Sequence, residues 1–228
     1  IPPFTFNCLR SIIGAAFLFG FMAVMSIKNK DYVIVPNAMN KKLLLTGGIL
    51  CGLALAVSTN FQQFGIAAYP QDAPVEARSG FITALYVIVV PILSVFVKKK
   101  VPIIVWISAL VAIGGFYMLC LFEGTGGFYL ADILVLACTF TFSLHIIVID
   151  KYCDAVGGVR LSAFQFVFAA IISGVMAIIF ELDLISLKNI LSVIPEILYM
   201  GIVSSGIAYT LQIVGQKHCD PTVASLIM

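Results

Sequence analysis

Charged residues are scarce in this chain of 228 amino acids. They make up 11% of the sequence and hydrophobic residues 61%, whereas roughly a quarter of an ordinary soluble domain is charged. No Asp or Glu occurs at all between Arg78 and Phe122. This shortage of charge argues against a water-soluble globular domain and predicts a chain that lies in lipid.

Several patterns of catalytic and metal sites are missing as well. The six cysteines form no Cys-x-x-Cys pair, and the chain has no His-Glu-x-x-His and no paired mid-membrane Asp. Such patterns mark zinc sites and intramembrane enzymes. We therefore expect no metal, no cofactor and no enzymatic activity. We expect the cysteines to pack as small apolar side chains in helices, apart from two thiols in loops.

The apolar residues gather into windows that are long enough to cross a membrane, which takes roughly 20 helical residues. Short links with turn residues, such as YPQDAP, EGTGG and DAVGG, separate them. An open sheet would leave backbone groups unpaired in lipid, so the windows predict an all-α, multi-pass helix bundle. The seven windows are Phe4–Ser26, Leu43–Tyr69, Arg78–Val97, Val101–Phe122, Asp132–Asp150, Leu161–Phe180 and Ile197–Gln216.

The basic residues predict the orientation of these windows. If the links alternate sides, one side holds ten Lys and Arg residues and the other holds two. Basic residues are retained on the cytoplasmic side, so the first side is predicted to be cytoplasmic and the protein to lie in the cytoplasmic membrane. Lys98, Lys99 and Lys100 are interpreted as a topology anchor rather than as a patch for lipid or nucleic acid. We expect no nucleic-acid partner.

Two stretches resemble each other across the chain. FQQFGIAAYPQDAPVEARSGFI, residues 61–82, and LQIVGQKHCDPTVASLIM, residues 211–228, share a Gln, a Gly and a polar link with Pro, and Gly65 and Gly215 lie 150 residues apart. Five windows separate the copies, so they run in opposite directions and predict an inverted repeat of five plus five helices. On this hypothesis, residues 1–128 are the first repeat without its first helix, and residues 129–228 are the second repeat without most of its last two.

Six segments in order resemble EamA-type transporters of the drug/metabolite transporter superfamily. They are IPPFTFNCLRSIIGAA, FQQFGIAA, ARSGFITALYVIVVPILSVFV, VWISALVAIGGFYML, ADILVLACTFTFSLHIIVID and GIAYTLQIVGQKHCDPTVASLI. The resemblance implies a ten-helix bundle of two inverted halves that moves small metabolites by alternating access, commonly as an exporter. Many members carry a Glu shortly after the fourth helix, where this chain has Lys98 to Lys100, so no role of that acid is transferred.

Arg10 is the one basic residue well inside a predicted window. A charged residue at this depth costs about 2.5 to 3.5 kcal/mol on insertion scales, which favours a partner or a wet cavity. Arg10 is therefore a candidate to bind an anionic group of a substrate. The alternative is that its side chain extends to the membrane surface.

Amide and phenol groups mark two further windows. Asn60 and Gln63 share one helix face through their spacing of three, and Tyr209 and Gln212 share another. We expect these four side chains to line a central cavity and to bond a neutral or zwitterionic metabolite. Contacts between helices are the alternative, because polar residues in membranes often provide them.

His145 is the one group within a window that titrates near neutral pH. It is a candidate to line the cytoplasmic half of the pathway or to carry a proton, although a neutral His bonded to a neighbouring helix explains it equally well. Asp132 and Asp150 lie at window ends, where an interfacial position is expected.

These features predict a transporter of small polar metabolites, such as amino acids. An exporter of cationic drugs is the first alternative, but it normally needs an acid at depth, and no window has one at its centre. A channel-like membrane protein is the second alternative. It is compatible with a repeat, but inverted repeats with polar clusters in both halves are typical of alternating access.

Overall fold

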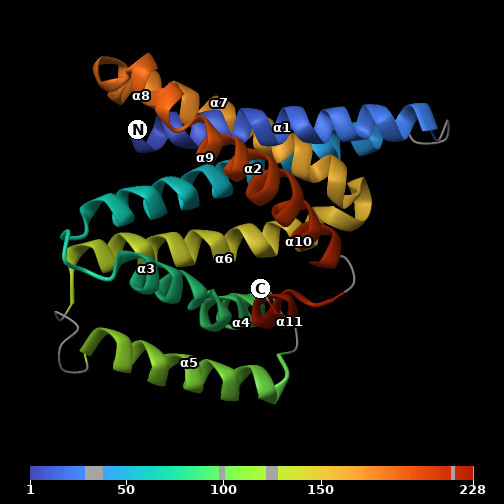
Figure 1. The fold of residues 1–228 in the computed structure, drawn as a ribbon. Coiled ribbons are helices and arrows are strands. Elements are labelled where there is room, and N and C mark those ends of the chain that lie inside the picture. Colours follow the sequence, from blue (N-terminus) through green and yellow to red (C-terminus); the bar gives the residue numbers. More distant parts are fainter. Residues whose placement is uncertain (29–37, 98–100, 122–127, 217–218, 228) are drawn as a thin grey trace. The chain divides into compact units, whose positions relative to one another are not determined.

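Residues 1–28, 38–97, 101–121, 128–216 and 219–227 are described by a computed structural model, shown in Figure 1. Throughout these ranges the secondary structure is helical, without strands, which confirms the all-α prediction. The elements are α1 (Pro3–Lys28), α2 (Ala38–Ala68), α3 (Val75–Ala84), α4 (Tyr86–Phe96), α5 (Ile103–Leu121), α6 (Leu130–Val156), α7 (Gly158–Phe180), η1 (Leu182–Leu184), α8 (Leu187–Ser192), α9 (Ile194–Tyr199), η2 (Met200–Ala208), α10 (Tyr209–Gln216) and α11 (Pro221–Ile227).

Among the described residues, six helical segments are long and apolar enough to cross a membrane. They coincide with all the predicted windows except the fourth, and the chain is therefore a multi-pass membrane protein. The fourth window falls on α5, a helix of 19 residues, of which the part Ile103–Gly115 is an apolar helix. The triplet Lys98 to Lys100, interpreted as a topology anchor, lies outside the described residues.

The chain divides into two compact units. The first comprises Ile1–Ala56 and Val148–His218, and the second comprises Val57–Ile147 and Cys219–Met228. The long helices α2 and α6 each contribute residues to both units.

In the first unit, α1 packs along α7 in the opposite direction (Figure 1). The ring of Phe4 lies 6.1 Å from that of Phe180, and the ring of Phe19 lies 5.9 Å from that of Phe164. Residue numbers rise along one helix as they fall along the other, so the pair is antiparallel.

Glycines bring α2 against α7 in the same unit. A Cβ on Gly48 would lie 2.9 Å from Cβ of Phe164, and one on Gly52 would lie 2.6 Å from Cβ of Phe168. Both distances are shorter than two carbon atoms in contact allow, about 3.5 to 4.0 Å. The Gly-x-x-x-Gly spacing on α2 therefore serves close helix packing, the role that such pairs have in membrane proteins.

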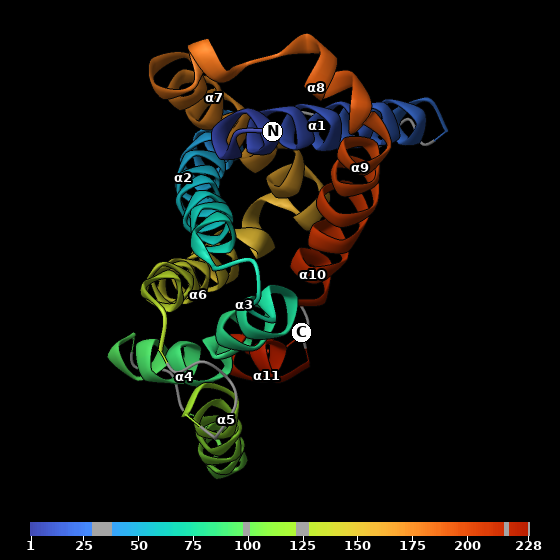
Figure 2. The same ribbon diagram turned by 60° about the vertical axis from the view of Figure 1, so that its left-hand side comes forward.

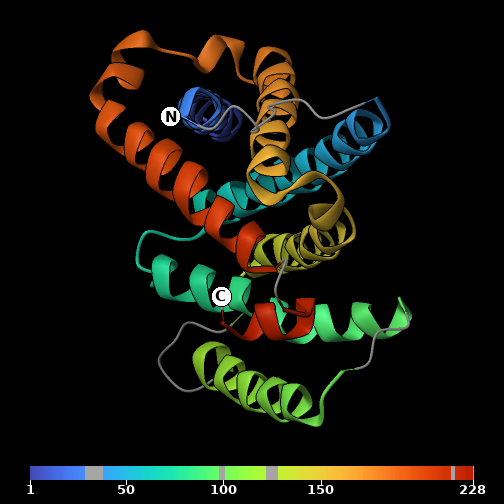
Figure 3. The ribbon, with the colours of Figure 1, turned by 90° about the vertical axis from the view of Figure 1, so that its right-hand side faces the viewer.

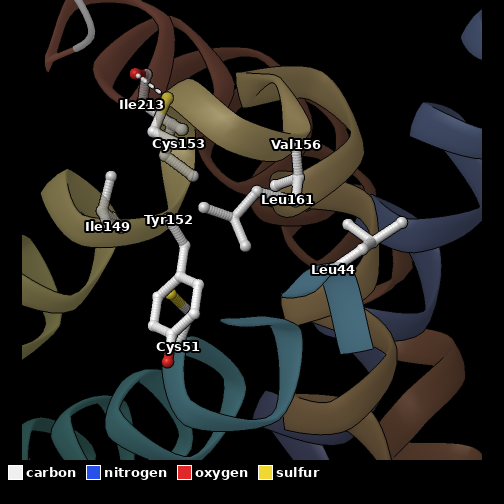
Figure 4. Close-up of a cluster of buried hydrophobic side chains, with 8 residues drawn as sticks. All are labelled: Leu44, Cys51, Ile149, Tyr152, Cys153, Val156, Leu161 and Ile213. Carbon is white, nitrogen blue, oxygen red and sulfur yellow. Dashed lines mark hydrogen bonds between the residues drawn. The ribbon is translucent and has the colours of Figure 1, made fainter. Parts of the chain in front are cut away.

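The apolar core of the first unit lies where α2, α6, α7 and α10 meet (Figure 4). Tyr152 is 8% exposed, and Cys153 donates a hydrogen bond from Sγ to the carbonyl oxygen of Ile213 over 3.3 Å. The thiol thus packs as a small apolar group with a weak donor, as expected for buried cysteines. The cluster consists of Leu44, Cys51, Ile149, Tyr152, Cys153, Val156, Leu161 and Ile213.

In the second unit, α11 packs against α4 and α5 (Figure 3). The helix predicted for the third window turns at Leu85, between α3 and α4, and Pro91 lies within α4. Gly65 on α2 faces α6 closely, since a Cβ there would lie 2.7 Å from Cγ2 of Val135. Gly115 on α5 is equally close to Phe81 on α3, since a Cβ on Gly115 would lie 2.7 Å from Cζ of Phe81.

Candidate functional site

Arg10 lies within the first unit and is 4% exposed. It stands about 8 Å from the middle of α1, at about 1.5 Å per residue, and so within the hydrocarbon half-thickness of about 15 Å. A side chain that extended along a lipid-facing surface would be exposed on the protein. The burial of Arg10 therefore argues against that alternative and places the guanidinium among helices.

The helix facing Arg10 has an unusual backbone. Residues from Ile194 to Gln216 follow one another through α9, η2 and α10 (Figure 2), and η2 is a π-helix over nine residues. A Cβ on Gly201 would lie 3.2 Å from the carbonyl oxygen of Arg10, and one on Gly14 would lie 2.9 Å from Cβ of Ser205. The π-helix thus approaches α1 at the turns that carry Arg10 and Gly14. Segments of π-helix are rare and are often found at functional sites.

Tyr209 and Gln212 follow the π-helix on α10, and both are half-buried. The Tyr209 ring meets the ring of Phe166 edge to face at 5.8 Å. Beside it, the hydroxyl groups of Thr210 and Ser162 are 2.8 Å apart and form a hydrogen bond. Tyr209 and its neighbour Thr210 thus both contact α7.

In the second unit, Asn60 is 8% exposed and Gln63 is half-buried. The neighbouring Gln62, which the sequence did not single out, donates from Nε2 to Oγ1 of Thr83 over 3.3 Å. His145 is fully buried, with its ring 6.5 Å from that of Phe142 on the same helix.

The structure brings Arg10, Tyr209 and Gln212 into one unit and Asn60, Gln63 and His145 into the other. That Asn60, Gln63, Tyr209 and Gln212 line one central cavity stays a prediction.

A buried ion pair joins α3 to α6 in the second unit. Nη2 of Arg78 lies 2.6 Å from Oδ2 of Asp132, and both side chains are fully buried. That Asp132 lies at the membrane interface stays a prediction. The residue does lie in the first turn of α6, but protein surrounds its carboxylate.

Both carboxylate oxygens of Asp132 accept hydrogen bonds. The Tyr69 hydroxyl donates to Oδ1, and the N–H of Tyr129 donates to Oδ2 over 2.9 Å. The guanidinium of Arg78 lies 4.6 Å from the centre of the Tyr129 ring. Burial and the bond to Asp132 raise the pKa of Tyr69, so its phenol remains a donor at neutral pH. This saturated cluster holds the end of α2 and the starts of α3 and α6 together.

The sequence contains one signal for this cluster. Arg78 and Asp132 open the third and fifth predicted windows, which begin on the same side of the membrane. Opposite charges at the starts of two windows on one side of the membrane are candidates for an ion pair. Charged groups in membranes usually pair with one another.

Glu181 holds the start of α1 in the first unit. It is 4% exposed, and its oxygens accept from the N–H groups of Phe4 over 2.8 Å and of Thr5 over 2.7 Å. The first N–H groups of a helix have no partner within it, and a carboxylate is favourable there. Glu181 is therefore a structural group.

Among the described side chains, no group of three or more His, Cys, Asp or Glu residues is placed to hold a metal ion.

Comparisons with known proteins connect the chain to transporters. Residues 129–228 match the EamA-like transporter family, which confirms the resemblance indicated by the sequence segments. A protein of Archaeoglobus fulgidus described as an uncharacterized transporter is 30% identical over 158 residues, which are 67% of this chain and 41% of that protein. The chain thus spans about two fifths of the length of this curated relative.

A solved crystal structure, described only as that of a protein, shares the fold. It superposes with a TM-score of 0.72 at 20% sequence identity, over 100% of this chain and 74% of the other. At this identity the likeness concerns the fold alone.

Proposed function

We propose that this chain, whose residues 129–228 match the EamA-like transporter family, carries small polar metabolites across the cytoplasmic membrane by alternating access, as an exporter. That match is the observation on which the proposal rests. The six apolar helices supply a lipid-embedded scaffold, and buried polar side chains within them supply groups that can bond a solute. The two inverted repeats, 1–128 and 129–228, are part of the proposal.

The rival function, export of cationic drugs, needs a buried acid that is available to a cation. Among the described residues, the two buried acids are Asp132 and Glu181. Asp132 is paired with Arg78, and Glu181 accepts from the start of α1. Neither carboxylate is placed to receive a cationic drug without first losing these partners.

Transport by the intact protein in proteoliposomes tests the proposal. We expect saturable counterflow of at least one labelled solute from a panel of amino acids and related polar metabolites, and no saturable counterflow of the lipophilic cation tetraphenylphosphonium. Liposomes without protein are the control. Saturable movement of the cation alone would favour the drug exporter. A conductance that does not saturate would favour a channel.

Substitution of four polar residues tests the binding site. Ala variants of Asn60, Gln63, Tyr209 and Gln212 each remove one hydrogen bond, which contributes about 0.5 to 1.5 kcal/mol. Affinity for the transported solute should therefore fall by roughly two- to tenfold in each variant. His145→Gln adds a fifth candidate residue to the series. If all four Ala variants bind as tightly as the parent at equal expression, these residues are contacts between helices.

A further inference from the structure

Arg10 is a buried cation without a counter-charge. Among the described residues, the one ion pair is that of Arg78 with Asp132, and no hydrogen bond involves the Arg10 guanidinium. Burial of a charge is costly unless it is paired or hydrogen-bonded. An Arg that is 4% exposed therefore calls for an anion or for ordered water.

The elements packed against α1 do not provide that anion. Neither α7 nor η2 contains an Asp or Glu. Glu181, at the end of α7, is occupied by Phe4 and Thr5, and Glu196 on α9 is exposed and forms no ion pair with Arg10. The surroundings of Arg10 in this unit thus retain an uncompensated positive charge.

A second unsatisfied donor faces the same helix. Ser205 lies in the π-helix, is fully buried, and its Oγ has no hydrogen-bond partner among the described residues. It contacts α1 at Gly14, one helical turn after Arg10 and on the same face. A buried hydroxyl usually has a hydrogen-bond partner. The lack of a partner for Ser205 is therefore an independent indication that a ligand binds here.

We infer that Arg10 and Ser205, at the contact of α1 with η2, bind a carboxylate of the transported solute, an inference that rests on the proposed function. Arg presents two parallel N–H groups to a carboxylate, and such charge-assisted bonds are about twice as strong as neutral ones. The substrates are then metabolites with a carboxylate, bound by polar groups around an anionic end. The phosphate of an anionic lipid is the other source of the same chemistry.

The test compares carboxylates with their amides on the intact protein. Binding is measured by the thermal shift of purified protein with L-leucine against L-leucinamide, L-phenylalanine against L-phenylalaninamide, and succinate against succinamide. The parent should prefer the carboxylate of at least one pair by about tenfold or more. The preference should vanish in Arg10→Gln and be weakened in Ser205→Ala. It should survive in part in Arg10→Lys, which keeps the charge but not the fork of donors.

Lys28→Gln is the matched control, because it removes a positive charge from the exposed end of the same helix. It should leave the preference unchanged. A parent that shows no preference in any pair overturns the inference, and so does an Arg10→Gln protein that keeps it. Arg10→Lys decides the question if Arg10→Gln does not fold, since complete loss of folding in both variants would mark a structural residue and overturn the inference.

Two further comparisons distinguish a lipid phosphate from a solute carboxylate, and the anion site from the proposed transport function. The same variants are compared in liposomes of phosphatidylcholine with and without phosphatidylglycerol; an Arg10 effect that depends only on phosphatidylglycerol assigns the residue to lipid and overturns the inference. Solute transport without a carboxylate preference would leave the transporter proposal intact and refute the anion site. Arg10-dependent binding of carboxylates that are never carried would refute transport of these solutes and leave the anion site intact.

Discussion

At the scale of single residues, two buried arginines contrast with each other. Arg78 has a carboxylate at 2.6 Å and an aromatic ring at 4.6 Å, and its partner Asp132 is saturated by further donors. Arg10 has neither. A fully paired buried charge is typical of a structural clamp, whereas an unpaired one is typical of a ligand site.

Asp132→Asn should therefore destabilise the protein strongly. The change leaves the Arg78 guanidinium buried without a counter-charge, and breaking a buried pair costs about 3 to 5 kcal/mol. Glu76→Gln on the exposed surface of α3 is the control and should change the free energy of unfolding by no more than about 0.5 kcal/mol. Denaturant unfolding in detergent measures both.

The double variant Arg78→Met with Asp132→Leu tests the cause. It removes both charges, so it should be less destabilised than Asp132→Asn, because no unpaired charge remains. Equal stability of Asp132→Asn and the parent would show that the pair contributes little and that α3 and α6 are joined by apolar packing alone.

Sequence patterns predicted these residues unevenly. Arg10 was recognisable because a charge within an apolar window is conspicuous. Asp132 was interpreted as interfacial, because its position in the first turn of a window places it near the membrane surface. Its burial depends on Tyr69 and Arg78, which lie 63 and 54 residues away in sequence, and the spacing of residues along one helix contains no such information.

At the scale of elements, glycines set the distance between α2 and α7. Gly52→Ala would place Cβ 2.6 Å from Cβ of Phe168 and 2.8 Å from the backbone oxygen of Gln165, so the helices must separate. Overpacking of this kind typically costs about 1 to 3 kcal/mol. Thermal unfolding in detergent should show a lower transition temperature.

Gly20→Ala is the matched control in the same unit, since a Cβ there meets nothing within 4 Å. It should be neutral or slightly stabilising, because Ala favours a helix by about 0.8 to 1.0 kcal/mol over Gly. A Gly52→Ala protein as stable as the Gly20→Ala protein would show that α2 and α7 tolerate separation without loss.

The elements themselves were largely predictable, and their irregularities were not. Apolar windows indicate where a helix crosses lipid, because length and hydropathy alone determine that. The turn at Leu85 and the π-helix from Met200 to Ala208 leave no such signal. They alter hydrogen bonding within segments that remain apolar, and packing against neighbouring helices decides where they occur.

At the scale of the whole molecule, the helices packed against α1 in the first unit run in two opposite directions. The helix α1 is antiparallel to α7, which lies five predicted windows later, but it is parallel to the segment from η2 onward. Gly201 contacts Ile13, whereas Gly206 contacts Phe17, so residue numbers rise together along both helices. These directions are those of a chain that crosses the membrane in alternation.

The repeat predicts that its two polar links lie on opposite sides of the membrane. Asp72 follows α2, and Asp220 lies 148 residues later, after α10, and both are exposed. Five predicted windows separate the links, and the basic residues predict that the first link lies outside and the second in the cytoplasm. In a cysteine-free intact protein, Asp72→Cys should react with a membrane-impermeant maleimide on whole cells, and Asp220→Cys should react only after permeabilisation. Lys41→Cys serves as the cytoplasmic control. Reaction of Asp72→Cys and Asp220→Cys from the same side would refute the inversion itself, whereas exchange of their sides would refute only the orientation.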